Sequence, residues 1–388
     1  MSHRFKNDPK HVKKYGNNML PWLVLVSLLL VFATAALLLL VKNHVEAAKG
    51  SDYLIGANAI SGFDCDYSEA QRLYPIGDGI LKVSPTRIVY MSVSGKEIYT
   101  QDIQMQDPYC IIRGTYALVA DQAGFSYICV NSHGLVYSGN VSGQIGFAEL
   151  SFDGYCALII EEDNTNGAVC VLDNTGSKLA QWNSVESGYP VSVRFSPKSS
   201  VLSIALVDTD GSHMQPNLKQ IRIPDLSTGE SPYDYAFVSS EASSILPLIS
   251  YVDEDKLLWS GISMIYALSE GTLTAIPGTF PNINTMVSVN DKIGLFYSEG
   301  VGKQVLFACI DSSLNISSPL VLGNRLKAHS AFEKQILIAV DEKLLLVNTE
   351  SCVIEKELSV DEDIIRMFMT SDDRAVIVTS SGVREIRF

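Results

Sequence analysis

The sequence has few of the residues that build metal or redox centres. Only three of its six histidines follow residue 50, and His133, His213 and His329 do not lie at spacings typical of metal ligands. The seven cysteines form no C-x-x-C pair, and their odd number does not fit a complete disulfide framework. We therefore expect no metal or other cofactor, and cysteines that are mostly buried as free thiols.

Motifs for covalent catalysis and phosphate binding are absent as well. The sequence contains no G-x-S-x-G elbow, no S-x-x-K with a K-T-G partner and no G-x-x-x-x-G-K-[ST] loop. These absences favour a binding or scaffold role over catalysis. They do not exclude an enzyme whose site is assembled from loops that are distant in the sequence.

Positive charge is scarce after the first fifty residues. That part of the chain carries 22 basic and 41 acidic residues, a formal charge of −19. A body with this charge repels other polyanions. We therefore do not expect nucleic acid as a partner.

One long apolar run stands near the N-terminus. Residues 20–41 read LPWLVLVSLLLVFATAALLLLV and contain no charge. A run of this length crosses the roughly 30 Å hydrocarbon core of a bilayer as a helix. Five basic residues and one acidic residue precede it, and positive charge beside a span is retained in the cytoplasm.

The run predicts a single-pass layout at the cell membrane. We expect a basic cytoplasmic tail over residues 1–19, a transmembrane helix in the lipid bilayer over 20–41, a short linker over 42–52 and an extracytoplasmic body over 53–388. Trp22 lies where an indole ring favours the membrane interface. A secretory signal cleaved near Val45 is the alternative, although its apolar part is usually only about 7 to 15 residues long.

Strand-turn-strand units recur through the body. Their central turns lie at Gly95, Gly134, Gly176, Gly229, Gly271, Ser313 and Ser351. The intervals between these turns are 39, 42, 53, 42, 42 and 38 residues. A repeat of about 40 residues with several short strands is typical of a β-propeller blade.

The strand pattern also predicts how the blades are built and closed. The second strand of each unit is the most continuously apolar, as in CALII at 156–160, and such a strand is covered on both faces. The last unit supplies three strands before Phe388, so we expect a fourth strand from the region just after residue 53, which removes the open edge. The prediction is an all-β propeller of about eight four-stranded blades, or seven if the region before Asp78 is only a linker. No long helical pattern follows residue 41.

Segments such as LDNTGSKLAQW and FSPKSSVLSIALVDTDG resemble the repeats of WD40-like and YVTN-like propellers. The layout of the whole chain resembles an uncharacterised family of single-pass, membrane-anchored propellers from Gram-positive bacteria. This resemblance implies a fold and an anchored scaffold, but no activity. No repeat ends in Trp-Asp or carries a Gly-His pair, which differs from WD40 repeats. Trp182 and Trp259 are the only tryptophans of the body, which differs from quinone-dependent propeller enzymes.

The fourth unit has the longest interval and supplies the candidate contact surface. The segment GSHMQPNL lies between two of its strands, and a Ser-rich stretch at 238–244 follows its last strand. In a propeller these two connections emerge on one face, and loops carry most binding function. We predict a contact surface made by His213, Met214, Gln215 and Tyr235.

The same unit contains a weak candidate for a cation site. Asp208 and Asp210 begin a D-x-D-G sequence, whose alternating carboxylates suit calcium. The remaining ligands of a calcium loop are missing. A polar turn is therefore the favoured interpretation.

Two functions remain open from the sequence. The first is a non-enzymatic binding or scaffold module, with a protein or a cell-envelope glycan as partner on the loop face of the propeller. The second is an extracytoplasmic hydrolase or lyase that uses loop carboxylates. Short acidic runs do end several strands, and paired carboxylates hydrolyse glycosides when their spacing is right.

Overall fold

The computed structural model describes residues 52, 53, 55, 58–300 and 302–388. The predicted tail, the predicted transmembrane helix with Trp22, and the predicted linker up to residue 51 lie outside these residues. In the part of the chain that is described, no helix has the length and apolar character needed to cross a bilayer.

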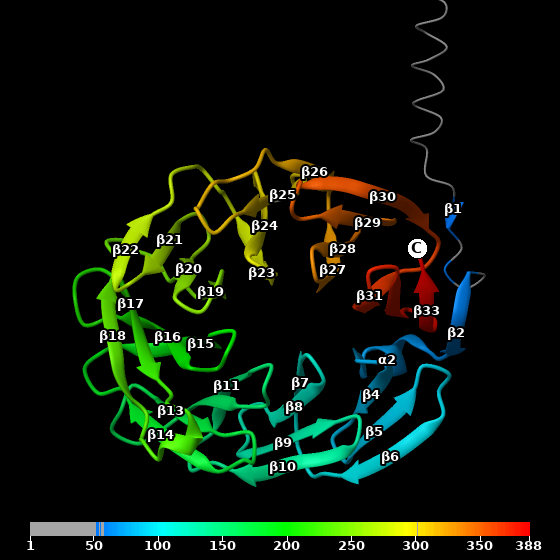
Figure 1. The fold of residues 1–388 in the computed structure, drawn as a ribbon. Coiled ribbons are helices and arrows are strands. Elements are labelled where there is room, and N and C mark those ends of the chain that lie inside the picture. The colour runs from blue at the N-terminus through cyan, green and yellow to red at the C-terminus, as the bar shows by residue number, and fades with distance from the viewer. Residues whose placement is uncertain (1–51, 54, 56–57, 301) are drawn as a thin grey trace, which may run out of the picture. The chain divides into compact units, whose positions relative to one another are not determined.

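Residues 52–388 form a ring of eight sheets, or blades (Figure 1). Within each blade the strands are antiparallel, and we label them A to D from the axis of the ring outwards. Short hairpin turns join these strands, so a blade can form from one continuous stretch of chain, as seven of the eight do. The prediction of an all-β propeller with eight four-stranded blades is confirmed.

Seven blades are built from four consecutive strands. Blade 1 contains β3 (Leu73–Ile76), β4 (Gly79–Val83), β5 (Arg87–Ser92) and β6 (Glu97–Asp102). Blade 2 contains β7 (Pro108–Arg113), β8 (Tyr116–Asp121), β9 (Ser126–Asn131) and β10 (Gly134–Asn140). Blade 3 contains β11 (Ile145–Leu150), β12 (Cys156–Ile160), β13 (Ala168–Leu172) and β14 (Lys178–Asn183). Blade 4 contains β15 (Tyr189–Phe195), β16 (Val201–Asp208), β17 (Gln215–Arg222) and β18 (Tyr233–Ser239).

The second half of the ring repeats this order. Blade 5 contains β19 (Leu248–Tyr251), β20 (Lys256–Ser260), β21 (Ile265–Ser269) and β22 (Thr272–Ala275). Blade 6 contains β23 (Ile283–Val289), β24 (Lys292–Ser298), β25 (Val305–Ile310) and β26 (Leu320–Gly323). Blade 7 contains β27 (Leu326–Phe332), β28 (Gln335–Val340), β29 (Lys343–Asn348) and β30 (Val353–Val360). All seven turns that carry the sequence repeat join strand C to strand D.

Blade 8 closes the ring with strands from both ends of the described chain. The C-terminal strands β31 (Ile364–Ser371), β32 (Arg374–Thr379) and β33 (Gly382–Arg387) are followed outwards by β2 (Ala59–Asp64). The two segments lie side by side in Figure 1, where β2 is blue and β33 is red. The antiparallel register places Gly62 opposite Arg384 and Asp64 opposite Gly382. The predicted closure by an N-terminal strand is therefore confirmed.

A second N-terminal contact lies on blade 7. The two-residue strand β1 (Asp52–Tyr53) pairs in parallel with the outer edge of β30, opposite Ser359 and Val360. The backbone N–H of Ile55 then donates a 2.8 Å hydrogen bond to the Asp361 carboxylate. The body thus begins at Asp52, the last residue of the predicted linker.

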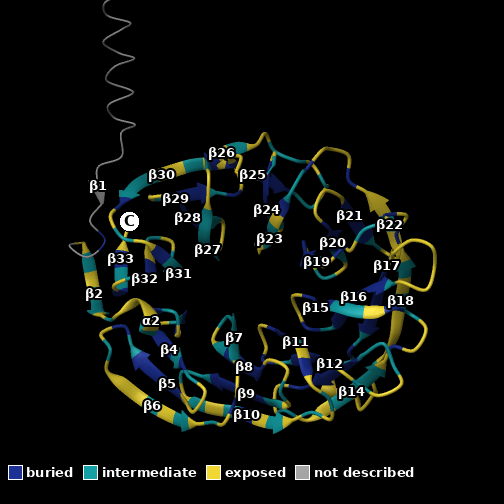
Figure 2. Cartoon of the chain, turned by 180° about the vertical axis from the view of Figure 1, so that it is seen from behind, coloured by how far each residue is buried: buried dark blue, intermediate teal, exposed yellow. Residues whose placement is uncertain are grey.

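The apolar core is divided between the blades. Eight clusters of buried hydrophobic side chains occur in the described residues, one at each boundary between neighbouring blades. The B strands are the most buried, because both of their faces meet a neighbouring blade, as in β12 and β16 (Figure 2). The D strands are largely exposed, as in β6.

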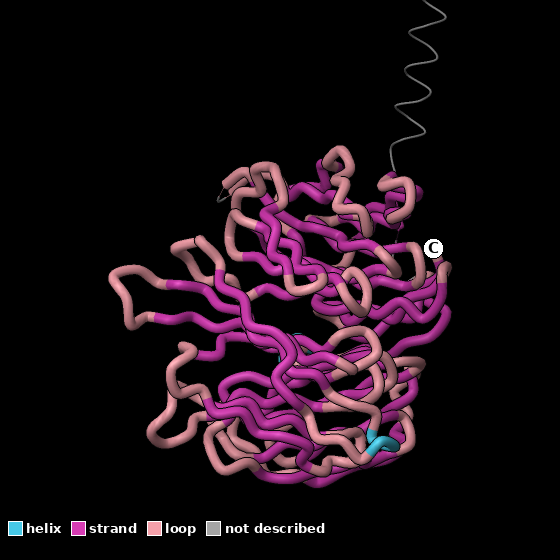
Figure 3. The backbone as a smooth tube through the Cα atoms, turned by 60° about the vertical axis from the view of Figure 1, so that its left-hand side comes forward, coloured by secondary structure: helices cyan, strands magenta, loops and turns pink. Residues whose placement is uncertain are grey.

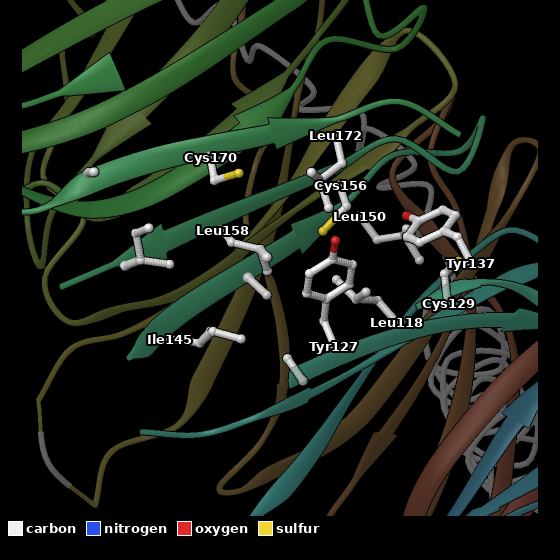
Figure 4. Close-up of a cluster of buried hydrophobic side chains, with 14 residues drawn as sticks. Leu118, Tyr127, Cys129, Tyr137, Ile145, Leu150, Cys156, Leu158, Cys170 and Leu172 are labelled. Atoms are coloured by element: carbon white, nitrogen blue, oxygen red, sulfur yellow. The ribbon is translucent and has the colours of Figure 1, made fainter. Parts of the chain in front are cut away.

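Three cysteines belong to the apolar cluster between blades 2 and 3. Cys129, Cys156 and Cys170 pack there among leucines and tyrosines (Figure 4). Burial raises the pKa of Cys129 to about 12 and holds the pKa of Cys156 well above its usual value, so these thiols are neutral and unreactive. All seven cysteines of the chain are free thiols.

Helix is confined to two short turns of the described chain (Figure 3). The turn α2 (Tyr67–Ala70) is capped by the Asp66 carboxylate, which accepts a 2.8 Å hydrogen bond from the Glu69 N–H. The 3-10 turn η1 (Leu226–Thr228) belongs to the connection between β17 and β18. The expectation of almost no helix in the body is met for these residues.

Closure depends on close backbone approach between β2 and β33. A Cβ atom added to Gly62 would lie 2.2 Å from the Val383 carbonyl oxygen. We predict that Gly62→Ala lowers the free energy of unfolding by about 1–3 kcal/mol, because a side chain there pushes β2 off blade 8. Urea unfolding of the full chain, followed by tryptophan fluorescence, measures this change.

Gly146→Ala is the matched control, since Gly146 also lies in a strand and its nearest atom to an added Cβ is the Ile159 carbonyl oxygen at 3.9 Å. This variant should unfold within about 0.5 kcal/mol of the wild type. Equal midpoints for the two variants would contradict a closure role for β2.

Candidate functional site

The A strands of the eight blades line a central channel. Three adjoining cavities of about 320, 670 and 250 Å³ open along it, and Thr285 of β23 borders all three. We call the 670 Å³ space the wide cavity. The lining residues come from several repeats, so the channel brings together side chains that lie far apart in the sequence.

A buried carboxylate joins two arginines across three blades. Glu149 of β11 is 7% exposed, and its Oε1 atom accepts hydrogen bonds from Arg113 of β7 and Arg194 of β15. The distances are 3.1 Å from Arg113 Nη2 and 2.8 Å from Arg194 Nη1. Arg194 Nε also donates to the Ile249 carbonyl of blade 5 at 3.2 Å. The two guanidinium groups are thereby fixed in the channel wall.

Similar polar contacts continue around the channel. Ser250 and Ser288 hydroxyls lie 3.0 Å apart across blades 5 and 6, and the Met369 N–H donates to the Ser330 hydroxyl at 2.8 Å across blades 7 and 8. Arg366 Nη1 of blade 8 donates to the Leu73 carbonyl of blade 1 at 3.4 Å. Contacts of this kind cross six of the eight blade boundaries. We call the residues that supply these side chains the channel belt: Arg113, Glu149, Arg194, Ser250, Ser288, Ser330 and Arg366.

The wide cavity is cationic. Arg113, Lys327 and Arg366 line it together with hydroxyl and aromatic side chains, and no Asp or Glu is among its lining residues. Lys327 has a carboxylate partner outside the lining, Asp363, at 2.6 Å. Among the described residues Arg366 has no carboxylate partner, and its guanidinium carbon lies 4.2 Å from the centre of the Tyr74 ring. This is a positive site within an acidic body.

Among the channel groups whose pKa is shifted by burial, His329 and Glu149 bear most on the charge of the channel at neutral pH. Burial and the nearby Arg113 lower the pKa of His329 to about 4, so its ring is neutral at pH 7, where it stacks on Phe296. Burial raises the pKa of Glu149 to about 7, while the contact with Arg113 opposes this rise. The cationic character of the wide cavity therefore comes from the arginines and the lysine, not from His329.

The structure does not bring the four predicted contact residues together. His213 and Met214 lie in the exposed loop between β16 and β17, and Gln215 is the first residue of β17. Tyr235 is also exposed, but it belongs to β18, between the residues paired with Gln220 and Ile221. About 20 Å of strand separates that position from Gln215, at roughly 3.3 Å per residue. Tyr235 therefore lies toward the opposite face of the ring from the other three residues, and a contact surface at His213, Met214 and Gln215 stays a prediction.

The carboxylate of Asp208 caps a turn. Its Oδ1 atom accepts a 2.9 Å hydrogen bond from the backbone N–H of Asp210. No group of three or more His, Cys, Asp or Glu side chains suited to a metal occurs within the described range. The geometry corresponds to the polar turn that the sequence favours.

The channel-belt residues are not among the residues predicted from the sequence. Arg113 and Glu149 are 36 residues apart, and Glu149 and Arg194 are 45 residues apart, close to one blade each. The only sequence signal is a polar residue inside the first strand of successive repeats. No short motif marks these positions.

The raised pKa of Glu149 predicts a pH dependence of stability. Because its folded pKa of about 7 exceeds the ordinary 4.5, the folded chain holds this proton more tightly than the unfolded chain. The contribution to stability is complete below pH 4.5 and is lost as the pH rises toward 7. It amounts to about 3 kcal/mol at roughly 1.4 kcal/mol per pKa unit. Glu149→Gln should remove this part of the pH dependence in urea unfolding curves.

Glu97→Gln, in the exposed strand β6, is the control and should keep the wild-type pH dependence. An unchanged pH dependence in Glu149→Gln would show that the carboxylate of Glu149 binds its proton equally tightly in the folded and unfolded states.

Three solved β-propellers resemble the fold of this chain at low sequence identity. Sqt1 from Chaetomium thermophilum, solved bound to the N-terminus of ribosomal protein L10, is 11% identical with a TM-score of 0.58, covering 85% of this chain and 100% of its own. AztD from Citrobacter koseri is 12% identical with a TM-score of 0.53, covering 75% of this chain and 86% of its own. BamB from Moraxella catarrhalis is 12% identical with a TM-score of 0.51, covering 85% and 99%. These likenesses show the fold alone.

A search of curated proteins finds no matching relative. The sequence profile of a family of unknown function, DUF5711, matches residues 56–388, which is nearly the whole propeller. The chain therefore belongs to the DUF5711 family.

Proposed function

We propose that this protein is a membrane-anchored, extracytoplasmic scaffold without enzymatic activity, which binds a protein partner at the central channel. The observation that carries the proposal is the wide cavity of about 670 Å³, where charged and aromatic side chains from several blades converge. A ring with an apolar cluster packed at every blade boundary presents such a site with little rearrangement, which favours binding.

The anchor and its orientation are supported by the sequence. Residues 20–41 are uncharged and long enough to span a bilayer, and the preceding residues are basic. The acidic body then lies on the extracytoplasmic side. With this arrangement the protein holds its partner at the cell membrane.

A protein partner is supported by one propeller of the same architecture. Sqt1 holds the N-terminus of ribosomal protein L10. The mixture of arginine and aromatic side chains around the wide cavity is typical of protein interfaces. A glycan of the cell envelope is the competing ligand.

A hydrolase or lyase that uses carboxylates is the alternative function. The pKa of about 7 at Glu149 suits a general acid. However, Glu149 is the only carboxylate among the described residues that line these cavities, and it borders only the two smaller ones. Its Oε1 atom is already bonded to two arginines. Hydrolysis of glycosides by a pair of carboxylates needs a second one nearby.

Photocrosslinking tests the position of the partner. Phe152 is 61% exposed and borders two of the channel cavities, whereas Ile98 is 56% exposed on the outer strand β6. A photoreactive residue at position 152 of the full chain in its own membranes should give a light-dependent adduct with one protein. Position 98 should not give this adduct.

A third crosslinker at Met214 tests the predicted loop surface. An adduct at 214 but not at 152 would move the binding site from the channel to the loop face. If neither position 152 nor position 214 gives a protein adduct, or if positions 98 and 152 give identical adducts, the proposal of a protein scaffold is contradicted.

Protease accessibility tests the orientation. Protease added outside wall-stripped cells should cleave the body, because the proposal places residues 53–388 on that side. A cytoplasmic protein that stays intact in the same cells is the control for leakage. A body that is cleaved only after the cells are lysed would reverse the proposed topology.

A further inference from the structure

We infer that the wide cavity recognises an acidic peptide segment that also carries apolar side chains, and that Arg366 is its principal contact. This inference rests on the proposed function, since it names the chemistry of the bound partner. Three observations support it: the positive charge of the cavity, the fixed position of the Arg366 guanidinium, and the apolar residues beside it.

The sign of the charge in the cavity is opposite to that of the body. The chain after residue 50 carries a formal charge of −19, yet the wide cavity is lined by Arg113, Lys327 and Arg366 with no carboxylate among its lining residues. Glu149 and Asp363 balance only part of this charge from outside the cavity. A positive site enclosed by low-dielectric walls concentrates the field toward an incoming anion.

Arg366 is held in place but is not neutralised. Its guanidinium stacks over Tyr74 at 4.2 Å and donates one hydrogen bond to the Leu73 carbonyl. Stacking fixes the plane of the guanidinium group, and its remaining N–H donors match the two oxygens of a carboxylate. The position of the Arg366 guanidinium group is therefore fixed without a bound ligand.

Apolar side chains line the same cavity and favour a peptide. Phe152, Ile365 and Phe368 are lining residues together with Arg366, and Phe152 is 61% exposed. A peptide with alternating acidic and apolar residues would satisfy both kinds of side chain. A linear polyphosphate would satisfy the cations but leave the aromatic rings exposed to water.

Binding of a defined peptide to the purified full chain tests the inference. The probe is a fluorescein-labelled peptide of alternating Glu and Phe, measured by fluorescence anisotropy. Arg366→Gln should weaken its binding at least about tenfold, because a charge-assisted hydrogen bond is lost in a partly desolvated site. Binding by the wild type should also weaken as the salt concentration rises.

Arg222→Gln is a closely matched control. Arg222 also stacks on a tyrosine, Tyr235, at 4.2 Å, but it lies on the outer part of blade 4. This variant should bind the peptide as the wild type does. Arg366→Lys should bind with intermediate affinity, because it keeps the charge but loses the planar donor pair.

Three results would overturn the inference. These are equal loss of affinity in Arg366→Gln and Arg222→Gln, equal binding of a Lys-Phe peptide, and tighter binding of inorganic polyphosphate than of the Glu-Phe peptide. If Arg366→Gln unfolds at a lower temperature than the wild type, Lys327→Gln replaces it and must show the same selective loss. A partner adduct at position 152 together with any of these results would leave the scaffold function in place and reject only the acidic peptide.

Discussion

The structure depends on the need to cover both faces of every blade. The B and C strands of a blade are apolar on both sides, so a single blade in water would expose two hydrophobic surfaces. Only a neighbour on each side removes them, and only a closed ring supplies a neighbour to the first and last blades. The eight inter-blade clusters are the result, and β2 provides the strand that completes the eighth blade.

The same constraint accounts for the polar channel. Toward the axis the blades converge, and the inner edge of each A strand has no neighbour to cover it. Polar groups there are satisfied by the next blade, as Glu149 is by Arg113 and Arg194, and as Ser288 is by Ser250. The channel belt therefore has two effects. It links neighbouring blades, and it leaves guanidinium groups directed toward the central channel. A buried ion pair is weak evidence for stability, but a fixed guanidinium is good preparation for binding.

The sequence predicted the features that repeat locally. Glycines such as Gly95 and Gly176, both with positive φ, mark the C–D turns at an interval near forty residues, and the three C-terminal strands implied a borrowed fourth. The channel belt was not predictable in this way. Arg113, Glu149 and Arg194 meet only because blade rotation brings successive A strands together, and neither hydropathy nor spacing fixes which side of an A strand faces the axis. Tyr235 shows a related point, because it belongs to the same repeat as the loop at 209–214 but lies beside the other end of β17.

The two N-terminal contacts define the order in which the ring would yield to a mechanical load. Tension applied at Asp52 acts first on β1, which holds blade 7 through a two-residue parallel pair and the bond from Ile55 to Asp361. Only after β1 peels away does the force reach β2, which is held in antiparallel register from Ala59 to Asp64. Under tension along the chain, β1 is therefore expected to detach from blade 7 before β2 detaches from blade 8. The closing strand stays paired while β1 carries the load.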